Sequence, residues 1–189
     1  MKAISWFRIV TILSIILANI GCDQVSKTIV RENVDFREHI SIIDDHFILT
    51  KDENTGAFLS FGSDFPPALR MFLLIFLPTL VLIFALKLVL TDQKFTRGTL
   101  LGLCFMIGGG IGNMIDRVMY GSVTDFLHID LGIVRTGVFN MADVSITIGA
   151  ILMLVFFPIN SKQAEETETP ETPQEEASAE PSDADTPQS

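Results

Sequence analysis

The chain has 189 residues, of which 48% are hydrophobic, and its mean hydropathy is +0.43. This composition is too apolar for a typical soluble domain, although the length fits one domain. The formal net charge of −10 does not indicate an acidic catalytic surface or a basic partner, because residues 161–189 account for −8 of it.

The residues that commonly bind metals show no metal-site pattern. Cys22 and Cys104 lie in apolar stretches without CxxC spacing, so neither a disulfide framework nor a zinc site is predicted. His39, His46 and His128 lack the spacing of metal ligands, and no G-x-S-x-G motif occurs. We therefore expect no metal, no cofactor and no nucleic-acid partner.

The first predicted membrane span covers residues 6–24 and has two interpretations. Its uncharged core, Ile9–Cys22, has 14 residues, fewer than the roughly 20 that a bilayer requires. That length, with basic residues before it, is typical of a signal peptide, and "NIGC" at residues 19–22 looks like the cleavage point of a lipoprotein precursor. Alternatively the helix is retained, because no Pro interrupts "DQVSKTIV" and the helix can continue through Val30.

Three further apolar stretches predict spans at about residues 67–90, 98–118 and 138–159. The second begins at Pro66-Pro67, and Pro78 is expected to kink it. The fold class is therefore mainly α, a polytopic membrane protein with four transmembrane helices. The segment Lys87–Arg97 is basic, which places it and both termini in the cytoplasm.

Loops of about residues 25–65 and 119–137 then lie outside. The first contains the strand-like stretches "HISII", "HFILT" and "GAFLSFG", which predict a small extracytoplasmic β-sheet. The acidic, Pro-containing residues 161–189 cannot bury enough apolar surface to fold. We thus expect a four-helix membrane domain over residues 1–160 and a disordered C-terminal tail over residues 161–189.

Polar residues that are unusual in or beside a span gather at the outer ends of the predicted helices. A carboxylate within a span costs roughly 2.5–3.5 kcal/mol on insertion scales, so these positions need a reason. Spacings of i,i+4 and i,i+3 place several of them on common helix faces. The set comprises Asp23, Asn54, Asn113, Asp116, Arg117, Asp125, Asn140 and Asp143.

Structural interpretations exist for part of this set. Asp116 and Arg117 could form an interfacial ion pair that holds two helices together. Gly108 and Gly112 form a GxxxG pattern, which favours close helix packing. Asp143 could simply make a buried hydrogen bond to a neighbouring helix.

The functional interpretation pairs Asp125 with Asp143. Two carboxyl groups close together do not both ionise easily, so one keeps its proton. The ionised group can take a proton from water while the other donates one to a carbonyl oxygen. This pair predicts peptide hydrolysis without a nucleophilic side chain or a metal.

Five short blocks give the chain a resemblance to lipoprotein signal peptidase (signal peptidase II), a family of integral-membrane aspartic proteases of bacteria. They are residues 23–27 (DQVSK), 54–58 (NTGAF), 109–117 (GGIGNMIDR), 123–126 (VTDF) and 139–143 (FNMAD). The resemblance covers about residues 6–160. It implies that Asp125 and Asp143 form the catalytic dyad. It also implies substrate- or dyad-positioning roles for Asn54, Asn113, Arg117 and Asn140, and supporting roles for Asp23, Lys27, Gly56, Asp116 and Ala142.

The resemblance further implies a substrate and a location. The family cleaves diacylglyceryl-modified prolipoproteins on the N-terminal side of the lipidated Cys, and it is the target of the cyclic peptide globomycin. We accordingly expect a monomer in the bacterial cytoplasmic (inner) membrane, surrounded by the lipid bilayer, with its active site at the outer face.

The same blocks bear on "NIGC". Asn19 stands three residues before Cys22, where lipoprotein signals favour an aliphatic residue, and the residues after Cys22 match the family's first block. Retention of the first helix is therefore expected. The other classes considered are a small transporter or channel subunit that uses Asp143 as an ion site, and a membrane protein lipidated at Cys22.

Overall fold

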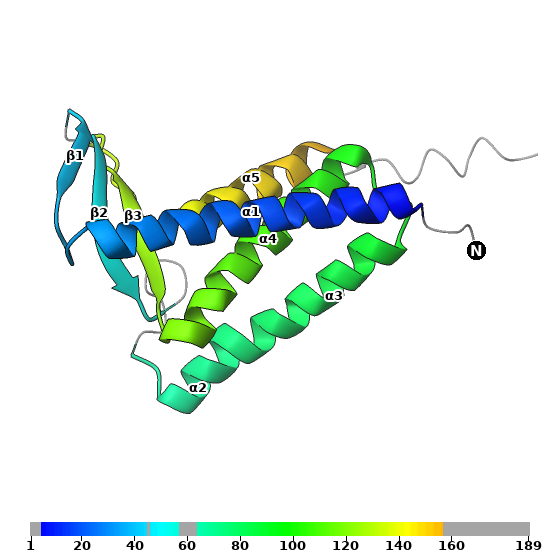
Figure 1. Cartoon of the computed structure of the whole chain (residues 1–189), viewed down its shortest axis with the longest axis horizontal. Helices are drawn as coiled ribbons and strands as arrows, with labels where there is room; N and C mark the ends of the chain where they lie inside the picture. The colour runs from blue at the N-terminus through cyan, green and yellow to red at the C-terminus, as the bar shows by residue number, and fades with distance from the viewer. Residues whose placement is uncertain (1–4, 45, 57–63, 157–189) are drawn as a thin grey trace, which may run out of the picture. The chain divides into compact units, whose positions relative to one another are not determined.

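Long apolar segments make most of the described part of the chain helical. The computed structural model describes residues 5–44, 46–56 and 64–156, all within the first of two units, Met1–Phe157 and Pro158–Ser189. The elements of this part are, in chain order, α1 (Trp6–Asn33), β1 (Ile40–Ile43), β2 (Phe47–Asn54), α2 (Pro67–Met71), η2 (Phe72–Phe76), α3 (Leu77–Thr91), α4 (Arg97–Tyr120), β3 (Val123–Ile129) and α5 (Met141–Phe156) (Figure 1).

The helices agree with the four predicted spans. Among the described residues, three helical segments are long and apolar enough to cross a membrane: α1, the continuous segment Pro67–Thr91, and α4. The fourth, α5, is a shorter apolar helix of 16 residues, or about 24 Å. The predicted disordered tail lies outside the described residues.

Two predicted boundaries differ from the structure. Helix α1 continues to Asn33, well past the predicted end at residue 24, because nothing in "DQVSKTIV" interrupts it. Helix α5 begins at Met141 rather than at residue 138. The reason is that Phe139 pairs with Leu127 of β3, and its carbonyl oxygen accepts hydrogen bonds from the backbone N–H groups of Phe126 and Leu127.

The predicted irregularity at Pro78 is present as a π-helical turn. Pro78 has no N–H to donate, so the regular bond to the carbonyl of Leu74 cannot form. The chain adopts the wider π-helical geometry over η2, which ends two residues before the proline. This turn carries Leu73 and Leu74, which matter for the site described below.

Within the described part, the sheet has three antiparallel strands in the order β1-β2-β3. The strands β1 and β2 correspond to the predicted "HISII" and "HFILT", whereas β3 lies in a segment predicted as a loop. The prediction for "GAFLSFG" concerns mostly residues 57–62, which lie outside the described residues. The sheet lies at one end of the helices, and its strands run across the direction of α1 (Figure 1).

Helix α4 packs closely against two neighbours through its glycines. A Cβ at Gly108 or Gly112 would lie 2.6 Å from atoms of Asn19 or Asp23 in α1, which confirms the packing interpretation of the GxxxG pattern. On another face, Gly102 meets Gly149 of α5 so closely that a Cβ on either would lie within 2.7 Å of the other's carbonyl oxygen.

This close approach predicts a large effect of Gly149→Val. Its side chain would meet backbone rather than a flexible neighbour, so α4 and α5 must separate, at a cost of about 1–3 kcal/mol or more. We expect a lower thermal unfolding midpoint of the purified protein in detergent. The matched control is Gly21→Ala, because nothing lies within 4 Å of a Cβ there; equal midpoints for the two variants would contradict the prediction.

Candidate active site

The predicted site residues converge where the helices meet the sheet. They separate into two hydrogen-bonded groups that share Asn113. One group contains the two carboxylates of the predicted dyad together with Asn54, Asn113 and Asn140. The other contains charged residues of α1 and α4.

Asp125 is held by two asparagine amides. It lies in β3 and is only 4% exposed. The side-chain nitrogen of Asn140 donates to Oδ1 of Asp125 at 2.6 Å, and the side-chain nitrogen of Asn54 donates to Oδ2 of Asp125 at 3.1 Å. Asn54 ends β2 and is paired in register with Val123, two residues before Asp125. Sheet pairing therefore places Asn54 next to Asp125, although 71 residues separate them in the sequence.

Asp143 lies in the first turn of α5 and completes a capping box with Asn140. The backbone N–H of Asp143 donates to Oδ1 of Asn140 at 3.1 Å, and the backbone N–H of Asn140 donates to Oδ2 of Asp143 at 3.2 Å. Such reciprocal bonds satisfy N–H groups that a helix start leaves without partners. The other carboxylate oxygen accepts from the amide nitrogen of Asn113 at 3.0 Å. This last bond is the interhelical hydrogen bond considered for Asp143.

Asn113 and Asn140 connect the two carboxylates. The amide nitrogen of Asn140 donates to Oδ1 of Asn113 at 3.1 Å as well as to Asp125. The ammonium group of Lys27 donates to the same Oδ1 at 2.9 Å. Because an ammonium group can only donate, Lys27 fixes the amide orientation of Asn113, and the Asn113 nitrogen then faces Asp143.

Lys27 also forms the centre of a buried charge cluster. Its Nζ lies 2.8 Å from Oδ2 of Asp23 and 3.0 Å from Oδ2 of Asp116, and all three side chains are fully buried. Arg31 approaches Asp116 at 2.9 Å. The predicted pairing of Asp116 with Arg117 is thus wrong: Asp116 binds cations of α1, because the i,i+1 position points Arg117 to a different face of α4.

Arg117 instead contacts the segment that follows β2. Its Nη2 donates to the carbonyl of Gly56 at 2.9 Å, and the N–H of Gly56 donates to Oδ1 of Asn54 at 2.9 Å. Ala142 belongs to the charge cluster through its backbone, since its N–H donates to Oδ1 of Asp23 at 2.9 Å. Asp23 therefore helps to cap α5, directly beside Asp143.

Both carboxylates open on a cavity of about 790 Å³. Asn54, Asn113, Arg117 and Asn140 also line it, whereas the residues assigned supporting roles do not. Most of the remaining wall is apolar and comes from four places to which the sequence analysis assigned no role in the site: η2 with Pro78, β3, the residues before α5, and the first turns of α5. These residues are Leu73, Leu74, Pro78, Val123, Ile129, Thr136, Gly137, Val138, Phe139, Val144, Ile146, Thr147 and Ile148.

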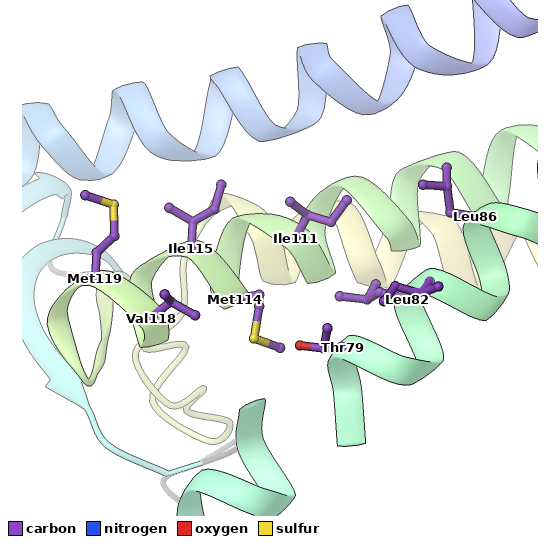
Figure 2. Close-up of a pocket in the computed structure, with 9 residues that line it drawn as sticks. Thr79, Leu82, Leu86, Ile111, Met114, Ile115, Val118 and Met119 are labelled. Carbon is purple, nitrogen blue, oxygen red and sulfur yellow. The ribbon is translucent and has the colours of Figure 1, made fainter. Parts of the chain in front are cut away.

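A second hollow lies elsewhere and is almost entirely apolar. It has a volume of about 390 Å³ and lies between α3 and α4, with Leu82 and Leu86 on one side and Ile111 and Ile115 on the other (Figure 2). No charged residue lines it. The chemistry of the molecule is therefore associated with the larger cavity.

Burial sets the protonation of Asp125. The pKa of its carboxyl is raised to about 7, chiefly because burial removes water contact and also because of the neighbouring charge of Asp143, while the hydrogen bonds from Asn54 and Asn140 act in the opposite direction. Asp125 therefore retains its proton at mildly acidic pH. Beside it, Asp143 accepts two hydrogen bonds, and both carboxyl groups face the same cavity.

This pKa predicts how stability depends on pH. Between about pH 4 and pH 7 the folded chain holds a proton on Asp125 that the unfolded chain releases, so wild-type stability falls as pH rises through this range. Asp125→Asn cannot ionise and lacks this loss, worth roughly 2–4 kcal/mol. We expect the unfolding midpoint of the variant, relative to wild type, to increase from pH 4.5 to pH 8. If the unfolding midpoints of the two proteins change in parallel with pH, the pKa of Asp125 is not raised in the folded protein.

Comparisons with known proteins agree with one another. The profile of the family described as "Signal peptidase (SPase) II" matches residues 15–159. The chain is 39% identical over 164 residues to the lipoprotein signal peptidase of Pelodictyon phaeoclathratiforme, covering 78% of this chain and 92% of that protein. It is 33% identical over 150 residues to that of Bacillus subtilis, covering 78% and 92%.

Solved structures support the fold. A bacterial membrane enzyme superposes with a TM-score of 0.69 at 24% identity, covering 90% of this chain and 94% of the other. A second such structure gives a TM-score of 0.68 at 25% identity, covering 77% and 90%. With its apolar helices and a family profile that spans most of its length, the chain belongs to the signal peptidase II family of membrane-embedded aspartic-type endopeptidases.

Proposed function

We propose that this chain removes the signal peptide from diacylglyceryl-modified prolipoproteins by cutting on the N-terminal side of the lipidated Cys, with Asp125 and Asp143 as its catalytic dyad. The observation that carries the proposal is the position of Asn140. Its side-chain nitrogen binds Asp125, and its backbone N–H and side-chain oxygen both bind Asp143. One residue thus fixes both carboxyl groups at the wall of one cavity.

The two groups divide the proton transfers between them. Asp143, as the carboxylate, takes a proton from a water molecule whose oxygen attacks the scissile carbonyl carbon, while Asp125 gives its proton to the carbonyl oxygen. A tetrahedral diol results. When the C–N bond breaks, Asp143 returns its proton to the departing nitrogen, and a hydroxyl of the diol returns one to Asp125. The dyad ends the cycle in its starting state, without any covalent intermediate.

The cavity walls suit a substrate that is partly peptide and partly lipid. Arg117, Asn54 and Asn113 supply polar groups for an unwound peptide backbone, since asparagine offers both a donor and an acceptor. The aliphatic residues of η2 and α5 supply apolar surface for a signal-peptide helix and for acyl chains. The polar groups lie at one end of the helices, where lipid meets water and a peptide bond can leave its helix.

We also propose that this end faces outward from the bacterial cytoplasmic membrane, with both termini in the cytoplasm. Lys87, Lys94 and Arg97 lie in or beside the connection between α3 and α4, at the end opposite the sheet (Figure 1). Arg8 joins them, because its guanidinium donates to the carbonyl of Val89 at 3.2 Å. Basic residues concentrate on cytoplasmic loops.

Cleavage of a purified substrate tests the proposal. Wild-type protein in detergent is mixed with a diacylglyceryl-modified prolipoprotein and, separately, with the same precursor lacking the lipid. We expect mass spectrometry to show a product that begins at the lipidated Cys in the first case, and intact precursor in the second. Cleavage at another bond, or equal cleavage of both precursors, would contradict the assigned substrate.

A further inference from the structure

The segment between β3 and α5 forms a hairpin that presents aliphatic side chains to its surroundings. Leu131 is 60% exposed, Ile133 is 99% exposed and Val134 is 61% exposed. Ile43 at the end of β1 is also 60% exposed and belongs to the same end of the sheet, because Ile43 pairs with Phe47, which pairs with Ile129. These four residues, Ile43, Leu131, Ile133 and Val134, are called the apolar tip below.

Hydrogen bonds and an ion pair fix the shape of the hairpin. The N–H of Leu131 donates to the carbonyl of Val134 at 2.9 Å, and Arg135 lies 2.9 Å from Asp130 in an ion pair. Gly132 has a φ of 75° at the turn, a conformation that favours glycine, and its N–H donates to Asp130 Oδ1 at 2.9 Å. These contacts hold the hairpin in a conformation in which the side chains of the apolar tip are exposed.

The base of the hairpin adjoins the cavity wall that α5 also forms. Ile129 and Thr136, at the base of the hairpin, line the same cavity as Thr147 and Ile148, which lie inside α5. Ile148 itself is partly exposed on the apolar surface of that helix. The strands run across the direction of α1 (Figure 1), so the hairpin extends sideways from the helices and does not continue along their axes.

We propose that the apolar tip inserts into the headgroup region of the lipid leaflet beside the sheet. Aliphatic side chains carried by an amphipathic element bury about 5–10 Å deep at this boundary. Arg135, which is 70% exposed next to the tip, can hold a lipid phosphate there. The contact fixes the height of the β3 wall of the cavity above the membrane, independently of which substrate the cavity accepts.

Site-specific fluorescence in vesicles tests this contact. In the full chain carrying Cys22→Ser and Cys104→Ala, a single cysteine is introduced as Ile133→Cys and labelled with an environment-sensitive dye. Glu38→Cys, at an exposed polar position between α1 and β1, is the control, and Leu131→Cys is a second tip position. The proteins are reconstituted in vesicles of phosphatidylethanolamine and phosphatidylglycerol, and then exposed to aqueous iodide or to lipid with a nitroxide near its headgroup.

We expect blue-shifted emission at both tip positions, strong quenching by the nitroxide lipid, and quenching by iodide that is roughly threefold weaker than at Glu38→Cys. Equal iodide quenching at tip and control, without nitroxide quenching, would show that the tip is in water and overturn the proposal. Protection from both quenchers that disappears on dilution in excess lipid would also overturn it, because a second copy of the chain would then cover the tip.

Discussion

Purified Asp125→Asn and Asp143→Asn variants are expected to cleave a diacylglyceryl-modified prolipoprotein at least about 10²–10⁴-fold more slowly than wild type, because positioned acid–base groups contribute factors of this size. Each change keeps the size of the side chain but removes its ability to carry a proton, and it keeps one of the two hydrogen bonds that each carboxyl group accepts, because an amide offers a single acceptor oxygen. Loss of kcat with little change in KM is expected, since Arg117 and Asn113, the proposed substrate-positioning residues, still line the cavity. The measurement is the initial rate of product formation at saturating substrate.

Asp52→Asn is the matched control for this pair. Asp52 lies directly across the ladder from Asp125, but it pairs with Arg37 at 3.7 Å in a partly exposed position and does not line the cavity. We expect it to retain nearly normal activity. If either dyad variant is folded and cleaves at a rate close to that of Asp52→Asn, the dyad assignment is wrong.

The second large effect is expected at Lys27. Replacing it in Lys27→Met leaves Asp23 and Asp116 buried near each other without their shared cation. Removal of one partner from a buried ion pair costs about 3–5 kcal/mol. Activity should fall with stability, because Asn113 loses the donor that orients its amide toward Asp143. The thermal unfolding midpoint in detergent and the cleavage rate at a temperature below that midpoint measure the two effects separately.

A double variant distinguishes charge from shape at this position. Lys27→Met combined with Asp23→Asn removes the carboxylate that loses its cation, since Asp116 keeps its ion pair with Arg31, and a buried ionic group replaced by neutral side chains is often tolerated. We therefore expect the double variant to recover part of the lost unfolding midpoint. A single Lys27→Met variant as stable as wild type would show that the cluster contributes little to the fold.

Local patterns in the sequence identified most of the architecture. Apolar length predicted the four helices, and "HISII" and "HFILT" predicted β1 and β2. The strand β3 was missed because "VTDFLHI" pairs with β2, from which it is separated by α2, η2, α3 and α4. A strand stabilised by so distant a partner shows no turn signal that would reveal it. Its omission matters, since β3 carries Asp125.

The site residues converged as expected, but several of their partners were not visible in the sequence. Asp116 was paired with its neighbour Arg117, whereas its cation, Lys27, lies 89 positions earlier; proximity in sequence says little about such contacts. Asn140 and Asp143 were placed on one helix face, although "NMAD" has the spacing of a capping box. That signal could have located the start of α5. The apolar cavity wall at η2 gave no signal apart from Pro78.

The alternative functions considered for the sequence are answered in different ways. Family membership identifies an enzyme rather than a transporter. Maturation at Cys22 would separate residues 1–21 from the rest, and this stretch carries Ile12 and Ile16 of the buried core. It would also remove Asn19, whose side-chain oxygen accepts a hydrogen bond from Ser145 of α5 at 2.8 Å. The structure thus uses the first helix as part of the folded domain.

The spacing of Asp23 and Lys27 has a consequence for biosynthesis. Helix α1 leaves the ribosome long before Asp116 and Ala142, which later surround these charges, have been made. A carboxylate or an ammonium group alone would raise the cost of inserting this helix by up to roughly 2.5–3.5 kcal/mol each. One helical turn apart and in contact at 2.8 Å, the two neutralise each other within α1. Helix α1 can therefore enter the lipid before α4 is made, and it already carries Lys27, the cation that later pairs with Asp116 of α4.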